Sequence, residues 1–195
     1  VVTKGLIGHG SALKNPSLGS PFGQQLYDLP QGADNLQFGL LRGLGVLTND
    51  WALTLNLYFL AGFFLIALSA HWVLRTLKFS FAVSLVTATL FAFLPFHFVR
   101  GPSHLLLTSY WMVPLAVLLL VWALSPTDGL VDPDAPTPTK WWRVSFRKRR
   151  LLVALVLAVV VGMSSSYYSG FAAILLVVSV VLAAMARREL RVLVP

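Results

Sequence analysis

The turn between two apolar runs, 79–99 and 104–124, holds a compact group of polar side chains. Its members are His97, Arg100, Ser103 and His104. Pro102 predicts a helix start at this turn, because proline suits the first helical position. The free amides of that helix start, together with the Arg100 guanidinium, predict an anion site, and a lipid phosphate is the anion expected there. The simpler alternative is that Arg100 snorkels to lipid headgroups and His104 bonds the backbone.

The two histidines of this turn also form a candidate metal pair. No glutamate or cysteine accompanies them, so we predict no metal site here. The cofactor stays unknown, with a divalent metal ion as the open alternative. The sequence has no P-loop, GxSxG, HExxH or dinucleotide fingerprint. A soluble nucleotide sugar handled in the cytosol is therefore not expected as a substrate.

Carboxylates and tyrosines supply further candidates on the same side. Asp28, in the stretch QLYDLP, has no obvious capping role and is the best candidate for an acid or base. Asp34 and Asp50 have simpler expected roles as helix caps. Tyr167 and Tyr168, in SSSYYSG, could stack on a sugar or hold a phosphate. Their alternative role is that of aromatic belt residues at the membrane interface.

The composition indicates a membrane protein. Hydrophobic residues make up 57% of the 195 residues and charged residues 11%, against about 25% charged residues in soluble domains. Several apolar runs reach the length of about 20 residues that crosses a bilayer, and they do not alternate with period two. The chain has no cysteine, which excludes disulfides and thiolate metal sites. We therefore predict an all-α integral membrane protein, a polytopic helix bundle.

We expect an extracytoplasmic loop over 1–50 and a transmembrane helix bundle over 51–195. The five expected membrane segments are 51–74, 79–99, 104–124, 151–166 and 171–186, with 125–150 as a cytoplasmic loop. Pro95 and Pro114 are expected to kink or end their helices. The last two segments, at about 16 residues or 24 Å of helix, fall short of the hydrocarbon core of about 30 Å. They either cross as short helices or form a re-entrant hairpin, with a polar tip over 164–170.

A short amphipathic helix is expected near the end of the first loop. Leucines recur at 36, 40, 44 and 47 and share one helical face. Asp34 and Gln37 have the spacing of a capping pair. We therefore predict a helix over 34–47 that seats on the membrane interface.

The basic residues set the orientation. The net charge of +8 would suggest nucleic acid in a soluble protein, but here the cations flank apolar runs, so membrane lipid is the expected partner and nucleic acid is not. Under the predicted topology, Lys4, Lys14, Arg42 and Arg100 lie outside, and the other eleven of the 15 Lys and Arg residues lie inside. Basic residues gather on the cytoplasmic side of short loops. Residues 1–50 are therefore expected outside and the C-terminal end in the cytoplasm.

Several stretches carry a resemblance to a known family. NPSLGSPFGQQLYDLPQGADN is similar to a first extracytoplasmic loop, LFAFLPFHFVRGPSHLLL to an outer hairpin, and GMSSSYYSGF to a later helix break. Together they resemble the GT-C-type multi-spanning glycosyltransferases of bacterial envelopes, in their actinobacterial form. The resemblance implies inverting transfer of a sugar from a polyprenyl-phosphate carrier to a glycan, lipid or protein acceptor, at the outer face of the bacterial plasma (inner) membrane.

The same resemblance bears on the catalytic acid. In that class the first loop carries a catalytic acidic residue soon after the first span. This sequence begins past that point, so the main catalytic aspartate is expected before Val1. Two other classes stay open: a transporter or lipid-linked sugar flippase, and a non-catalytic structural subunit. Charges at the ends of the spans favour the enzyme over a transporter, which usually carries ionisable groups near the midplane.

Overall fold

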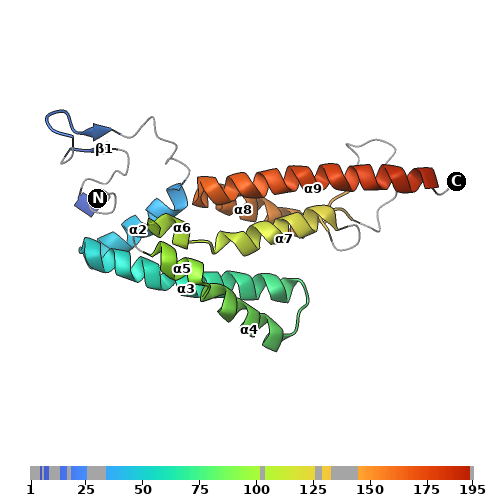
Figure 1. Ribbon diagram of the computed structural model, residues 1–195, viewed down its shortest axis with the longest axis horizontal. Helices are drawn as coiled ribbons and strands as arrows, with labels where there is room; N and C mark the ends of the chain where they lie inside the picture. The colour runs from blue at the N-terminus through green and yellow to red at the C-terminus, as the bar shows by residue number, and fades with distance from the viewer. Residues whose placement is uncertain are drawn as a thin grey trace.

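The computed structural model is dominated by helices (Figure 1). It describes residues 5, 7–8, 14–16, 19–25, 34–101, 104–125, 129–132 and 145–193, without the side chains of 184 and 186–193. The helices are α2 (Asn35–Thr48), α3 (Trp51–Thr76), α4 (Phe81–Ala92), α5 (Pro95–Arg100), α6 (Leu105–Thr108), α7 (Met112–Leu124), α8 (Lys148–Ser164) and α9 (Ser166–Leu193). The strands are β1 (Lys14–Asn15) and β2 (Gln24–Gln25).

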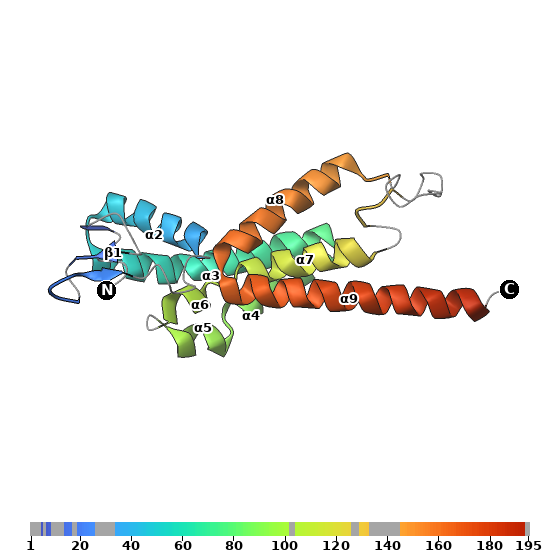
Figure 2. The same ribbon diagram turned by 90° about the horizontal axis from the view of Figure 1, so that it is seen from above.

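Two layers of helices run along the long axis of the molecule (Figures 1 and 2). Helices α3 and α4 pack against each other, and α7 packs against α3, α8 and α9. A central core of buried apolar side chains, among them Met112, Leu118 and Trp122, joins α7 to α3 and α8. At one end of the bundle α2 contacts both α3 and α8. This end brings α2 against the junction of α8 and α9.

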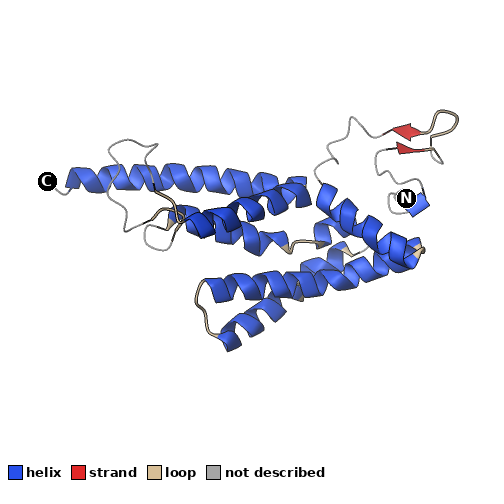
Figure 3. Ribbon diagram, turned by 180° about the vertical axis from the view of Figure 1, so that it is seen from behind, coloured by secondary structure: helices blue, strands red, loops and turns tan. Residues whose placement is uncertain are grey.

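The N-terminal region also contains a small antiparallel hairpin (Figure 3). Lys14 pairs with Gln25, and Asn15 with Gln24. Gly19 and Gly23 adopt positive φ angles of 68° and 78°, which suit a residue without a Cβ in this tight loop. Phe22 is 88% exposed at the tip, so the hairpin presents an aromatic side chain to its surroundings.

Helix capping confirms one sequence prediction and corrects another. The Asp50 side chain accepts hydrogen bonds from the Ala52 and Leu53 amides at 2.8 and 3.2 Å, so Asp50 caps α3 as expected. Asp34 precedes α2 but makes no side-chain cap bond to it. The predicted capping pair of Asp34 and Gln37 is therefore wrong, because both side chains are buried against other elements instead.

The buried face of α2 also differs from the prediction. The helix spans nearly the expected residues, but its buried positions are Gln37, Phe38, Leu41 and Gly45. Leu40 and Leu47, on the predicted apolar face, are exposed. Leu36 and Leu44 are half-buried, and Leu44 packs against the cluster of Phe38, Leu41, Tyr58 and Leu105. Only part of the leucine stripe, Leu40 and Leu47, is therefore left for an interfacial seat to cover.

Each of the next two expected segments consists of two helices, and a proline lies in the first turn of the second helix. The expected segment 79–99 becomes α4 and α5, with Pro95 at the start of α5, as the sequence predicted. The expected segment 104–124 is not one helix but the short α6 and then α7. Pro114 lies in the first turn of α7, where backbone amides need no partner within the helix. The helix therefore restarts just before this proline and is not kinked by it.

The last two segments differ most from the sequence prediction. The expected short segment 171–186 is part of α9, which has 28 residues and begins at Ser166. The expected loop over 125–150 ends earlier, because α8 already begins at Lys148. The expected polar tip over 164–170 is helical except at Ser165, which separates α8 from α9. The backbone of Ser165 is extended, with φ of −165° and ψ of 132°. Ser169 helps to close the first turn of α9 by donating to the Ser165 carbonyl at 2.6 Å.

Three helical stretches in the described part of the chain are long and apolar enough to cross a membrane. They are Trp51–Thr76, Phe81–Arg100 and Ser166–Ala183. Met112–Leu124 is apolar but shorter, and at 13 residues it extends about 20 Å. No residue of the apolar window in Ser166–Ala183 is buried within the protein. The all-α fold and the apolar helices agree with a membrane protein, and the structure supports three of the five expected segments at full spanning length.

The expected topology leads to a labelling prediction. Phe22 and Phe146 are exposed and lie in the regions expected on opposite sides of the membrane. Because the chain has no native cysteine, Phe22→Cys and Phe146→Cys can each be labelled without background. We expect an impermeant maleimide added to intact cells to label Phe22→Cys, and to reach Phe146→Cys only after the membrane is opened. Labelling of both from the same side would reject this topology.

Candidate functional site

A chain of buried hydrogen bonds links four parts of the protein. Ser109, after α6, donates to the Tyr58 hydroxyl on α3 at 2.9 Å. Tyr58 in turn donates to the Gln37 side-chain oxygen on α2 at 2.5 Å. The Gln37 amide nitrogen donates to the backbone carbonyl of Ser164, at the end of α8. Gln37 and Ser164 are 0% exposed, so this polar chain is fully enclosed.

The turn between α2 and α3 brings Gln37 and Tyr58 together. Asn49 adopts a left-handed conformation with φ of 50°, which asparagine tolerates better than most residues. Its amide bonds the Gly45 carbonyl and closes α2, and Asp50 then starts α3. The two helices consequently fold back on each other, and Gln37 meets Tyr58 although 21 residues separate them. An apolar cluster of Phe38, Leu41, Tyr58 and Leu105 stabilises this arrangement.

Asp34 lies beside this chain and faces the start of α9. Asp34 is 8% exposed, and its Oδ1 atom is buried without a hydrogen-bond partner among the described residues. Burial raises the pKa of the Asp34 carboxyl above its usual range, while the nearby Ser165 hydroxyl and Ser166 amide act in the opposite direction. The carboxyl therefore takes up a proton more readily here than it would in water.

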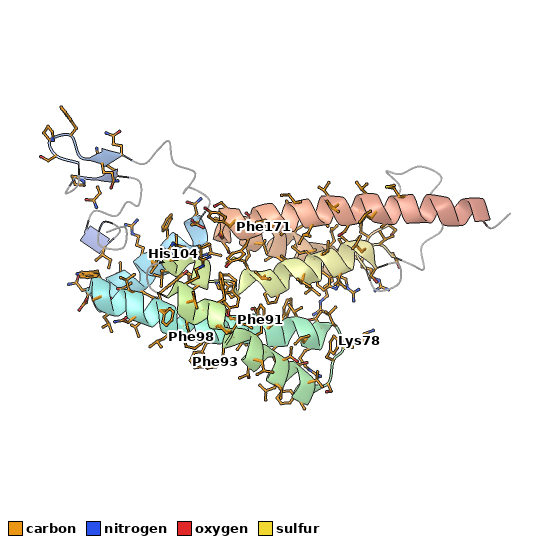
Figure 4. The ribbon with its side chains drawn as sticks, viewed as in Figure 1. Lys78, Phe91, Phe93, Phe98, His104 and Phe171 are labelled. Atoms are coloured by element: carbon orange, nitrogen blue, oxygen red, sulfur yellow. The ribbon has the colours of Figure 1, made fainter. Side chains whose placement is uncertain are left out.

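Arg100 and Tyr168 lie near each other at this end of the bundle. Arg100 ends α5 with an exposed side chain, and its guanidinium carbon lies 5.5 Å from the centre of the Phe96 ring. Tyr168, in the first turn of α9, donates to the Leu107 carbonyl at 2.6 Å and interacts electrostatically with Arg100. Figure 4 shows His104 and Phe171 at this end, where α6 and α9 begin, and Lys78 at the far end of α3.

The two histidines of the predicted anion site have opposite environments. His104 is exposed. His97 is fully buried, and its ring centre lies 4.0 Å from that of Phe63 and 4.6 Å from that of Phe59. Within the described residues, neither ring nitrogen of His97 makes a hydrogen bond of good geometry, although the Phe59 and Thr108 backbones lie close to the ring. The structure thus packs His97 into an aromatic group, while Arg100, one turn later on α5, faces outward.

The helix start that was expected to supply amides to this anion site is short. α6 begins at Leu105 and has four residues, so it lacks the aligned amides and the dipole of a long helix. Ser103 and Asp28, the other sequence candidates, lie outside the described residues. Tyr167 is 64% exposed on α9, whereas its neighbour Tyr168 packs inward. Among the predicted residues that the structure describes, Arg100 and Tyr168 come from different helices and interact electrostatically.

The buried polar chain is not among the sequence predictions. The sequence predicts helix-end positions for Gln37 and Asp34, and Tyr58 and Ser109 lie in otherwise apolar stretches. One clue was present, since a tyrosine hydroxyl inside an apolar span must find a partner. The partner itself could not be identified, because Gln37 and Ser164 are 127 residues apart.

Comparisons with known proteins assign no family to this chain. No family model, no curated protein and no solved structure matches the chain. Within the described residues, no group of three or more His, Cys, Asp or Glu side chains is arranged to hold a metal ion.

Proposed function

We propose that this chain is part of a GT-C-type membrane glycosyltransferase of the bacterial plasma membrane. It transfers a sugar, with inversion, from a polyprenyl-phosphate carrier to a glycan, lipid or protein acceptor at the extracytoplasmic face. The observations that support this best are the electrostatic interaction of Arg100 with Tyr168, at the start of α9, and the packing of α2 on α8 at the same end of an apolar helix bundle. A phosphate on a membrane lipid could reach an arginine at this level without leaving the bilayer surface.

In this proposal Arg100 holds the carrier phosphate. The guanidinium offers paired donors to phosphate oxygens, and its contact with Phe96 limits where it can point. Tyr168, Tyr167, His104 and Ser103 contribute to binding the phosphate or the sugar. His97 has a supporting role, because it packs behind the helix that carries Arg100. Asp28 is the proposed acid or base within this sequence, alongside a main catalytic aspartate before Val1.

The charge distribution of the spans favours an enzyme over a transporter. The stretches 51–74, 81–99 and 166–183 contain no Asp, Glu, Lys or Arg. Transporters and flippases usually place such residues near the membrane midplane, where they move ions or substrate. The cations lie instead at the helix ends, as with Arg75, whose guanidinium donates to the Phe79 carbonyl at 2.7 Å. This pattern supports chemistry at the surface of the bilayer.

Reconstitution distinguishes these two functions. The full-length protein, in vesicles with a polyprenyl-phosphate sugar carrying a labelled sugar, should release unglycosylated carrier lipid in step with a labelled acceptor. Vesicles without the protein provide the baseline for spontaneous hydrolysis. Movement of the intact labelled lipid between leaflets, with no sugar transferred in the presence of envelope acceptors, would instead support a flippase and reject the enzyme.

A further inference from the structure

Helix α2 is joined to the rest of the protein in two different ways. Toward α3 and α6 it buries Phe38 and Leu41 in an apolar cluster. Toward α8 and α9 it presents polar groups: Gln37 bonds the Ser164 carbonyl, and Asp34 faces Ser165. An apolar contact persists at any pH, whereas a contact made by a carboxyl depends on its proton. The polar contact of α2 with α8 and α9 can therefore change with pH, whereas its apolar contact with α3 and α6 cannot.

We propose that Asp34 and Gln37 form a clasp between α2 and the junction of α8 and α9, and that protonation of Asp34 closes this clasp. Closing it fixes the extramembrane helix α2 against the break at Ser165. Opening it separates α2 from the start of α9, the helix turn that also carries Tyr168. The proposal concerns this motion and does not depend on the reaction that the protein performs.

The unpartnered oxygen of Asp34 provides the physical reason. In the closed arrangement no donor from the part of the chain that the structure describes reaches the buried Oδ1 atom. This burial is unfavourable for an ionised carboxylate and much less so for a neutral carboxyl. The groups that face Asp34 within the described residues are Tyr58 from α3, and the uncharged Ser165 hydroxyl and Ser166 amide from the α8–α9 junction. None of these groups supplies a positive charge that would keep the carboxylate ionised.

The direction of the pH dependence follows from the same environment. Burial raises the pKa of Asp34 in the closed state above its ordinary value. The proton therefore binds the closed state more tightly than the open state, and closure is fully favoured at a pH below the ordinary carboxyl value. This advantage is lost as the pH rises through the raised pKa of the closed state. The open fraction should accordingly increase with pH.

The absence of native cysteine allows a direct measurement of opening. Ser164 is 0% exposed, and its backbone carbonyl, not its side chain, accepts from Gln37, so Ser164→Cys keeps this bond and acts as a buried probe. Met163→Cys is the matched control, because Met163 is the preceding residue on α8 and is 44% exposed. The ratio of the two maleimide labelling rates, in the full chain in nanodiscs, removes the pH dependence of the thiol itself.

When it is measured from about pH 4 to about pH 8, the ratio is expected to rise with pH, by about tenfold for each pKa unit by which closure raises the pKa of Asp34. Asp34→Asn keeps the shape and stays neutral, so its ratio should be low and independent of pH. Gln37→Met retains the length but loses both hydrogen bonds, and should raise the ratio about 2- to 10-fold at low pH. Tyr58→Phe, which deletes one hydroxyl, should give a smaller increase.

Two outcomes would overturn the proposal. A parent ratio that is flat across this pH range would reject the role of the proton. A ratio unchanged by both Gln37→Met and Tyr58→Phe would reject the clasp itself. Tyr58→Phe removes a single oxygen and leaves the aromatic ring in the apolar cluster. If Gln37→Met does not fold, the labelling ratio of Tyr58→Phe alone therefore still tests the clasp.

Discussion

Replacing Arg100 by alanine should weaken binding of a polyprenyl-phosphate sugar by about 10- to 150-fold. The estimate corresponds to the loss of a charge-assisted contact of about 1.5–3 kcal/mol. Arg100 is exposed at the end of α5 and contacts the Phe96 ring, so its removal leaves the packed core unchanged. Arg100→Lys should recover part of the affinity, because lysine keeps the charge and loses the planar pair of donors.

The measurement is donor affinity of the full-length protein in nanodiscs, with the unglycosylated polyprenyl phosphate as a second ligand. Arg42→Ala is the matched control, because Arg42 is an exposed arginine on α2, on the side expected to be extracytoplasmic. It should change the affinity less than about twofold, as expected for a solvent-exposed charge. Equal affinities of parent and Arg100→Ala would mean that Arg100 is only an anchor to headgroups, and the proposed phosphate site would be wrong.

The second large effect is expected at Gly62 on α3. A Cβ placed there would lie 2.9 Å from Cε1 of His97, closer than carbon atoms pack. The His97 ring has little room to move, because it is fully buried between Phe59 and Phe63. Gly62→Ala should therefore destabilise the protein by about 1–3 kcal/mol. This loss outweighs the gain of up to about 1 kcal/mol that alanine brings to a helix interior.

Gly39→Ala on α2 is the control for backbone effects. A Cβ at Gly39 meets nothing within 4 Å, so the change should stabilise α2 by about 0.5–1 kcal/mol. The measurement is thermal or denaturant unfolding in detergent, followed by helical circular dichroism. The double variant Gly62→Ala with His97→Ala should be less destabilised than the two single losses combined, because the clash disappears with the ring. If the losses of stability in the two single variants simply add in the double variant, Gly62 is not needed to make room for the His97 ring.

The amino-acid sequence determined the class of the protein and most of its helices. The long apolar runs required helices, because a bilayer satisfies no backbone polar group. Asp50 predicted the start of α3, and Pro95 the division between α4 and α5, because capping and proline geometry act within a few residues. The charge pattern fixed an expected orientation by the same kind of local rule.

Local rules failed where two arrangements were almost equally good. The stretch SSSYYSG predicts a polar tip, but serines also suit the start of a helix, and the packing of Tyr168 against the core favours a helix from Ser166. The apolar run 104–124 predicts one helix, although Pro114 equally suits the first turn of a new one. Only contacts with other elements distinguish such alternatives.

The buried polar chain was decided by tertiary structure alone. Gln37, Tyr58 and Ser164 belong to three helices, and nothing in their sequence neighbourhoods indicates that they meet. The same holds for Asp34, whose position before a helix predicts a cap, and whose actual neighbour is the start of α9. Sequence period and capping describe one helix at a time, whereas burial of a polar group is determined by the helices that surround it.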